Sequence, residues 1–287
     1  MKWQGRRGSR NIEDRRRSGG MRKVGGIGGI GMIAILLIGY FLGVDVTPLL
    51  NGGNQGGVAP RTGATTGTLS AEEKAAGQFV SVTLADTEEI WGDIFRKQVG
   101  KPYTPATLVL FSGATASACG GANGSTGPFY CPLDKKVYLD TAFFTTLSRR
   151  MGAKGDFAAA YVVAHEIGHH VQDELGILSE STAIRRQLSE ADSNAVSVRV
   201  ELQADCYAGL WARQAQAKFG TLERGDIEEA MNAAGRIGDD TLQRNAGRRP
   251  MPDSFTHGTS EQRQRWFLRG FKSGDLAACN TFNANPL

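Results

Sequence analysis

Two histidines four residues apart, His165 and His169, constrain this chain more than any other feature of the sequence. On an α-helix this spacing puts both imidazoles on one face, about one turn apart, so both can reach a single metal ion. Asp156 can cap the start of such a helix, residues 157–164 are apolar, and Gly176 favours its end. Because neutral imidazole is a typical zinc ligand, we predict a helical Zn²⁺ site with both histidines as ligands.

Glu166 follows the first histidine and completes the pattern His-Glu-x-x-His. Zinc with an open coordination position lowers the pKa of a bound water, and an adjacent carboxylate can accept the proton. We therefore predict that Glu166 is the general base. The alternative is an ordinary helix that carries the pattern by chance. His170 lies about 140° around the helix from His165, so we interpret it as a surface or supporting residue.

A second pair of acidic residues, Glu201 and Asp205, has the same spacing in a segment with a helical pattern. One carboxylate can bind the metal while the other orients a ligand histidine, although such pairs are commonly a solvated stripe. His257 is the only histidine outside the first motif. It is therefore a candidate for the third ligand or for a hydrogen-bond donor to the transition state.

The N-terminal region predicts a membrane anchor. Residues 1–23 contain nine basic and two acidic side chains, a balance of +7, so the net charge of +4 leaves −3 for the remainder. Residues 24–44 are an uncharged run long enough to span a bilayer, and the preceding basic residues predict a cytoplasmic N-terminus. A cleaved signal peptide is the alternative. The mildly acidic remainder gives no indication of nucleic-acid binding.

Residues 45–68 are rich in Gly, Thr and Asn and predict a flexible linker, which leaves 69–287 as the folded domain. A capping box of Ser70 and Glu73 marks its first helix. Helical patterns cover residues 71–82, 87–99 and 179–220, the last with a break near Asp192, whereas residues 107–111, 128–131 and 137–140 are strand-like. We expect an α+β fold, mainly helical, with a small antiparallel sheet whose edge can hold an extended peptide.

The four cysteines are Cys119, Cys131, Cys206 and Cys279. An even number on the exported side of a membrane predicts disulfides. Cys119 and Cys131 flank a glycine-rich loop and are expected to pair, which leaves Cys206 for Cys279. Four reduced cysteines are the alternative, and the absence of a Cys-x-x-Cys spacing disfavours a cysteine zinc site.

Over nearly its whole length the chain resembles the bacterial neutral zinc metallopeptidase family of membrane-anchored proteins. The matching blocks are residues 3–7, 11–15, 101–103, 127–132, 137–140, 165–170, 201–206 and 257–263. The pattern His-Glu-x-x-His followed by Glu-x-x-x-Asp also resembles the gluzincin arrangement of the CAAX-prenyl and HtpX-like membrane proteases.

This resemblance implies a zincin-like fold in which Glu201 is the third zinc ligand and Asp205 supports a histidine. It also implies that His257 and Arg263, six residues apart, serve the reaction rather than the metal.

We therefore expect a zinc-dependent endopeptidase that cleaves exported or envelope proteins. It would be anchored in the bacterial inner (plasma) membrane by one span, with its domain in the periplasm or outside the cell. The alternatives are an inactive envelope adaptor protein that keeps zinc as a structural ion, and a scaffold without metal. A structural zinc site is closed and has no use for a base such as Glu166, which favours the peptidase.

Overall fold

A computed structural model describes residues 1–17, 68–123 and 126–287. The helices are α3 (Ala71–Ile94), α4 (Ala142–Arg149), α5 (Asp156–Glu174), α6 (Ile177–Arg185), α7 (Glu190–Phe219), α8 (Asp226–Arg236), α9 (Asp239–Asn245) and α10 (Ser260–Ser273). Short helical turns are η1 (Phe95–Val99), η2 (Pro252–Ser254) and η3 (Leu276–Cys279). The strands are β1 (Ile12–Asp14), β2 (Thr107–Phe111), β3 (Ala114–Ser117), β4 (Gly120–Asn123), β5 (Phe129–Cys131) and β6 (Lys136–Asp140).

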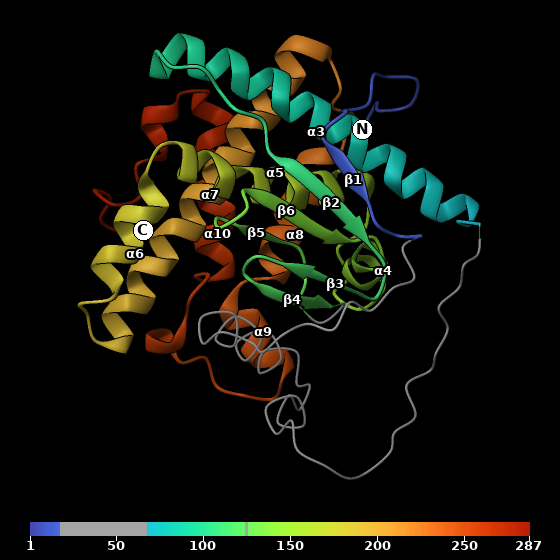
Figure 1. The fold of residues 1–287 in the computed structure, drawn as a ribbon. Coiled ribbons are helices and arrows are strands. Elements are labelled where there is room, and N and C mark those ends of the chain that lie inside the picture. The colour runs from blue at the N-terminus through green and yellow to red at the C-terminus, as the bar shows by residue number, and fades with distance from the viewer. Residues whose placement is uncertain (18–67, 124–125) are drawn as a thin grey trace, which may run out of the picture.

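The predicted transmembrane helix at 24–44 and the predicted linker at 45–68 lie outside the described residues, except for residue 68. Among the helices that the structure describes, none combines the length and the apolar character needed to cross a membrane. The prediction of a mainly helical α+β fold is confirmed, since the helices enclose two small sheets (Figure 1).

The main sheet is mixed, with the strand order β1-β2-β6-β5. β2 pairs in parallel with both β1 and β6, whereas β5 and β6 are antiparallel. The expected purely antiparallel sheet is therefore wrong. β5 lies between β2 and β6 in the sequence and runs opposite to both, so the turn at residues 132–135 brings β6 into the direction of β2. The separate hairpin of β3 and β4 is closed by a two-residue turn at 118–119.

Residues 1–17 belong to the folded domain, although the predicted domain boundary at 69 left them out. β1 extends the sheet beside β2, and the Lys136 ammonium lies 2.7 Å from the Glu13 carboxylate. The Trp3 ring packs edge-on against Phe79 of α3, with 5.5 Å between centroids. Residues 1–17 and the domain therefore form one packed unit.

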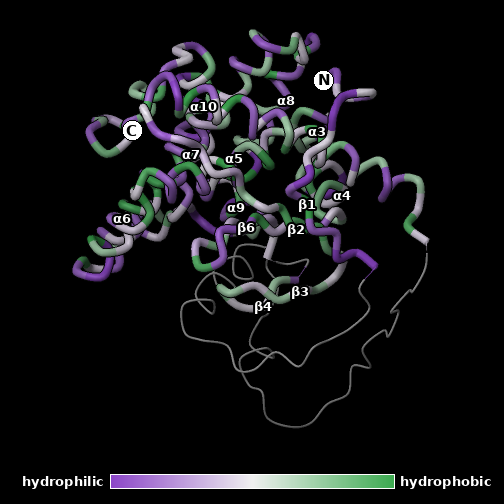
Figure 2. The backbone as a smooth tube through the Cα atoms, turned by 45° about the horizontal axis from the view of Figure 1, so that its top comes forward, coloured by the Kyte–Doolittle hydropathy of each residue, from purple (hydrophilic) through white to green (hydrophobic). Residues whose placement is uncertain are grey.

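Helix α5 occupies the middle of the molecule, where it contacts α3, α6, α7, α8, β5 and β6 (Figures 1 and 2). Its apolar residues 157–164 are all buried, which explains why this segment carries no polar face. We expected Asp156 to be the N-cap, and this is wrong. The helix already begins at Asp156, and Gly155 is the residue that precedes it. The Asp156 carboxylate instead accepts a hydrogen bond of 2.6 Å from the Met1 amino group. Gly176 follows the end of α5 in a left-handed conformation, which confirms the predicted stop.

Two predicted helix breaks are wrong. α3 continues through residues 83–86, because the Thr83 hydroxyl bonds to the Phe79 carbonyl within the helix, and Asp86 forms an ion pair with Arg6. The break between α6 and α7 falls at residues 186–189, not near Asp192, because Ser189 caps α7. In the sequence pattern these polar residues look like helix breaks. In the structure their polar groups are satisfied by hydrogen bonds or by an ion pair.

Both predicted disulfides are confirmed. Cys119 pairs with Cys131 and joins the β3–β4 hairpin to β5, whereas Cys206 pairs with Cys279 and joins α7 to η3.

Three glycines allow α7 to approach α5 and α10 closely. A Cβ atom at Gly168 of α5 would lie 3.1 Å from the Ala204 carbonyl oxygen of α7. At the crossing of α7 and α10 there is less room still. A Cβ at Gly209 would lie 1.9 Å from the Phe267 carbonyl oxygen, and one at Gly270 would lie 1.9 Å from the Cys206 carbonyl oxygen. The position of α7 therefore depends on the absence of side chains here.

The replacement Gly209→Ala should destabilise the protein by about 1–3 kcal/mol, because the new methyl group forces α7 and α10 apart. Gly92→Ala is the matched control, since Gly92 is also a helical glycine but a Cβ there meets nothing within 4 Å. It should leave stability unchanged or raise it by about 0.5–1 kcal/mol. Urea unfolding measures both free energies. Equal stability of the two variants would contradict the close crossing.

Candidate metal centre

Two histidines of α5 and one glutamate of α7 converge on a single point. The Nε2 atoms of His165 and His169 lie 3.2 Å and 3.5 Å from the two carboxylate oxygens of Glu201. One potential ligand atom from each residue lies within 4.8 Å of the others. The exposed fractions of the side chains rise from 8% for His165 to 13% for His169 and 18% for Glu201. The cluster is therefore nearly buried and is most open toward Glu201.

The geometry of these three groups fits a zinc ion. Tetrahedral coordination with bonds of about 2.0–2.1 Å places neighbouring ligand atoms about 3.3 Å apart. The two nitrogen–oxygen distances of 3.2 Å and 3.5 Å, each to a different oxygen of Glu201, are close to that separation. Two imidazoles and one carboxylate also form a donor set typical of catalytic zinc, and three protein ligands leave a fourth position open.

A fully buried carboxylate, that of Asp205, holds His165 from behind. Its Oδ1 atom lies 2.9 Å from His165 Nδ1, so His165 directs Nε2 toward Glu201. Arg263 of α10 donates two hydrogen bonds to Asp205, at 2.8 Å and 3.0 Å, and the Tyr161 hydroxyl donates another. Burial raises the pKa of Asp205, but the charges of Arg263 and His165 and their hydrogen bonds together outweigh burial and hold the pKa below its usual value. Asp205 is therefore an ionised acceptor.

Arg263 was predicted to serve the reaction together with His257, but its position does not agree with that role. The guanidinium is 3% exposed and lies behind His165, where it contacts Asp205 and Tyr161. Arg263 is thus a positioning residue that acts through Asp205. Sequence reasoning missed Tyr161, although it lies one helical turn before His165 on the same face of α5.

Burial lowers the pKa of His165, but the negative charge of Asp205 and the hydrogen bonds to Asp205 and Glu201 outweigh it and raise the pKa to about 10. Burial also raises the pKa of Glu201, yet the nearby His169 and His257 outweigh this and hold it well below its usual range. The ionised carboxylates that favour a protonated imidazole in this site favour a divalent cation for the same electrostatic reason.

Glu166 lies beside His165 and is 8% exposed. Burial raises its pKa from the ordinary carboxyl value, while His165 and His169 act in the opposite direction. A raised pKa makes the carboxylate a stronger proton acceptor than an ordinary carboxylate, as a general base requires. The environment of Glu166 is thus consistent with the role that the sequence predicted.

His257 lies in the loop before α10 and interacts electrostatically with Glu201. Asp239 at the start of α9 holds the ring, since its Oδ1 lies 3.1 Å from His257 Nδ1. Oδ2 of Asp239 accepts the backbone N–H groups of Thr256, His257 and Gly258. With Nδ1 engaged, Nε2 is the ring nitrogen available to another group. Asp239 was not foreseen, because it lies 18 residues from His257 in the sequence.

Of the two interpretations of His170, the surface residue is wrong, whereas the supporting residue agrees with the structure. Its side chain is buried, with Nε2 2.6 Å from the Thr104 carbonyl oxygen and Nδ1 3.1 Å from the Tyr130 hydroxyl. Burial lowers the pKa of His170, so the imidazole is neutral. Its contacts join α5 to β5, next to the metal site.

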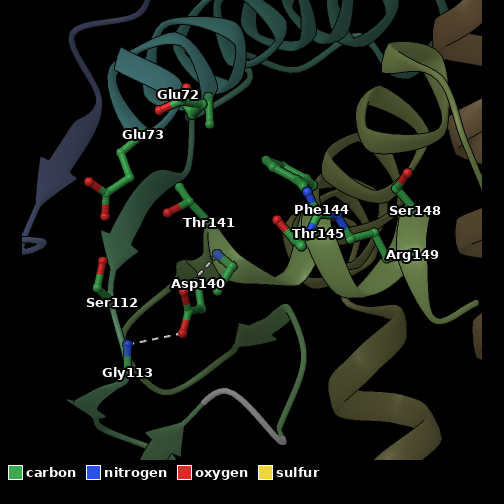
Figure 3. A pocket seen from close by; sticks show the side chains of 12 residues that line it. Glu72, Glu73, Ser112, Gly113, Asp140, Thr141, Phe144, Thr145, Ser148 and Arg149 are labelled. Atoms are coloured by element: carbon green, nitrogen blue, oxygen red, sulfur yellow. Dashed lines mark hydrogen bonds between the residues drawn. The ribbon is translucent and has the colours of Figure 1, made fainter. Parts of the chain in front are cut away.

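A pocket and a cluster of acidic side chains lie elsewhere in the described part of the molecule. A pocket of about 560 Å³ lies between the start of α3, α4 and the ends of β2 and β6 (Figure 3). It contains none of the converging ligands, and its Asp140 is already bonded to the backbone of Gly113 and Ala142. Asp156, Asp226 and Glu229 also cluster, but the Met1 amino group lies between the first two. Neither feature offers a comparable set of ligands.

The fold and the site define a protein with a helical His-Glu-x-x-His metal centre completed by a glutamate from a second helix. The chain belongs to the family described as "Putative neutral zinc metallopeptidase", whose sequence model matches residues 1–282. The description of the family implies zinc and, at the level of the family, hydrolase activity.

Two relatives illustrate the family. The uncharacterised protein YpfJ of Escherichia coli strain K12 is 47% identical over 290 residues, which cover 98% of this chain and 99% of YpfJ. The uncharacterised protein Rv2575 of Mycobacterium tuberculosis strain H37Rv is 45% identical over 195 residues, which cover 64% of this chain and 65% of Rv2575. No solved structure matches the chain significantly.

The replacements Glu201→Ala and His257→Ala should have different effects on zinc. Glu201→Ala removes one of three converging ligands and should lose most of the bound metal. His257→Ala should keep the metal, because Asp239 holds that ring at Nδ1 outside the ligand cluster. Metal analysis of the dialysed proteins measures this, with Glu190→Ala at the exposed start of α7 as control. An empty His257→Ala and a loaded Glu201→Ala would exchange the two roles.

Proposed function

We propose that this protein is a zinc-dependent endopeptidase that hydrolyses peptide bonds of exported or envelope proteins. One observation carries the proposal: ligand atoms of His165, His169 and Glu201 converge within 4.8 Å of one another, with Glu166 beside them. The fourth, open position distinguishes such a site from a closed structural one. Membership in the zinc metallopeptidase family supports the same conclusion.

Zinc in this site would polarise the scissile carbonyl group and lower the pKa of the attacking water. Glu166 accepts the proton of that water and passes it to the leaving amine. Asp205 and Arg263 keep His165 in the tautomer that binds through Nε2. His257, fixed by Asp239, donates a hydrogen bond from Nε2 to the developing oxyanion.

The substrate is expected to bind in an extended conformation along β5. This strand is at the edge of the main sheet and contacts α5, the helix of the two histidines. An edge strand can pair with the backbone of a peptide, which suits an enzyme that acts on many sequences. Tyr130 of β5 donates a 2.8 Å hydrogen bond to Asp173 of α5 and so holds the edge against the catalytic helix. We therefore also propose that the sheet and α5 together form a zincin-like fold.

An inactive adaptor protein that keeps zinc for stability is the second candidate. Its site would gain nothing from Glu166, a carboxyl group that is costly to bury beside the metal ligands. The two candidates are separated by the turnover of a peptide library.

The replacement Glu166→Gln should keep the fold and the bound zinc but reduce peptide hydrolysis by at least about 10²-fold, because an amide cannot accept the proton. Hydrolysis of a quenched fluorescent peptide library and metal analysis of the same samples measure the two properties. Glu174→Gln, at the C-terminal end of α5, is the control. Undiminished turnover in Glu166→Gln would remove this residue from the role of base.

We further propose that the domain lies outside the plasma membrane, associated with it through residues 24–44. Two disulfides support an oxidising compartment. Because β1 pairs with β2, we place residues 1–17 on the same side as the domain.

Labelling of intact spheroplasts with a membrane-impermeant amine reagent tests this location. Lys2 and Lys97 are both exposed in the folded domain, so mass spectrometry should find both modified. Modification of Lys97 but not Lys2 would support a cytoplasmic N-terminus and contradict the docking of residues 1–17. Modification of neither would place the domain inside the cell, and permeabilised cells serve as the control for reactivity.

A further inference from the structure

A chain of buried amide groups leads away from the second histidine of the metal centre. His169 Nδ1 lies 2.8 Å from the Oε1 atom of Gln172, and the Nε2 atom of Gln172 donates to Oε1 of Gln203 at 3.0 Å. The Nε2 atom of Gln203 donates in turn to the carbonyl oxygen of Cys279 at 3.1 Å. The side chains belong to residues that are 0% exposed (Gln172) and 4% exposed (Gln203). Water therefore does not compete for these bonds.

Two backbone carbonyl groups fix the direction of every bond in this chain. The Val200 carbonyl lies 2.7 Å from Gln172 Nε2, and the Cys279 carbonyl receives Gln203 Nε2. Since a carbonyl oxygen only accepts, each amide must turn its NH₂ group toward its carbonyl. Gln172 Oε1 is then left facing His169, so His169 Nδ1 must carry the proton. The Nε2 atom, which faces Glu201, keeps the lone pair that a metal requires.

The far end of the chain is fixed by a disulfide. Cys279 lies in η3 near the C-terminus, and its bond to Cys206 attaches that segment to α7. Both cysteines are fully buried, and Cys206 directly follows Asp205. The Thr281 hydroxyl donates to the Arg199 carbonyl at 2.7 Å, which adds a second contact between the segment and α7. The disulfide thus holds the carbonyl that orients Gln203 at its own residue, while hydrogen bonds of Arg199 and Arg269 hold the residues on either side of it.

We propose that Gln172 and Gln203 are positioning residues that hold His169 in its metal-binding tautomer, and that the Cys206–Cys279 disulfide maintains this relay. Reduction of that disulfide then weakens zinc binding. The inference rests on the proposed zinc site. The two histidines are held differently. An ionised carboxylate fixes the tautomer of His165, whereas neutral amides that depend on a distant carbonyl group fix that of His169.

The effect on metal affinity follows from the geometry. Loss of a group that orients a ligand histidine typically lowers metal affinity about 10–100-fold. Gln172→Leu removes the acceptor for His169 Nδ1 and should raise the zinc dissociation constant by about that factor. Gln203→Leu frees the Gln172 amide from one of its two acceptors and should have a smaller effect in the same direction.

The test measures zinc dissociation constants of the purified full-length chain by competition with a chromophoric chelator. The variants are Gln172→Leu, Gln203→Leu, the disulfide variant Cys206→Ala/Cys279→Ala, and the last two combined. Gln214→Leu on α7 and Cys119→Ala/Cys131→Ala are the controls, since neither lies on the relay. Circular dichroism selects folded samples. Visible spectra of the cobalt-loaded proteins report the ligand field, which a loss of stability alone does not change.

We expect the disulfide variant to bind zinc more weakly than the wild type and the controls, but no more weakly when Gln203→Leu is also present. Such non-additivity shows that the disulfide acts through Gln203. Additive effects would overturn the link to the disulfide. If the disulfide variant does not fold, the single glutamine variants decide, and wild-type affinity in Gln172→Leu overturns the relay. A wild-type chain that binds no zinc would refute the proposed function as well, whereas unchanged affinity in the variants refutes the relay alone.

Discussion

The close approach of α7 to both α5 and α10 is the constraint on which the rest of this structure depends. It requires Gly168, Gly209 and Gly270, since a side chain at any of them would meet the backbone of the neighbouring helix. Because the helix axes lie so close, polar side chains near each crossing reach the neighbouring helix. Glu201 reaches the histidines of α5, and Arg263 of α10 reaches Asp205. The site is thus a consequence of backbone packing, which explains why so much of its chemistry is buried.

Burial of so many polar groups is tolerated because they are paired in a definite order. An unpaired buried charge is strongly destabilising, whereas Asp205 is satisfied by Arg263, Tyr161 and His165. The two histidines are supported in different ways, His165 by a charge and His169 by a neutral amide. The first support is a charged group held by Arg263, whereas the second belongs to the chain of amides that we propose depends on the Cys206–Cys279 disulfide.

The N-terminal strand shows how tertiary contacts can change the meaning of a sequence pattern. Basic residues before an apolar run indicate a cytoplasmic tail, and by charge alone that interpretation is sound. In the structure the same charges have specific partners, with Arg6 at Asp86 and Arg16 at the Glu73 carbonyl. The mixed sheet likewise depends on contacts between segments that are far apart in the sequence, because β1 and β6 both pair in parallel with β2. Pairings between distant segments leave no periodic signal in the sequence.

The sequence by itself determined the helix of His165 and His169, the capping box of α3, the mainly helical fold and the two disulfides. These features depend on local spacing, on composition or on a count of cysteines, all of which are readable along the chain. Only the tertiary structure decided that Arg263 supports Asp205, that Val200 and Gln203 of α7 orient the Gln172 amide, that Asp239 holds His257, and that residues 1–17 complete the sheet. These contacts join segments or side chains whose partnership arises only when α5, α7, α9 and α10 pack, because a hydrogen bond requires proximity in space and sequence separation does not encode it.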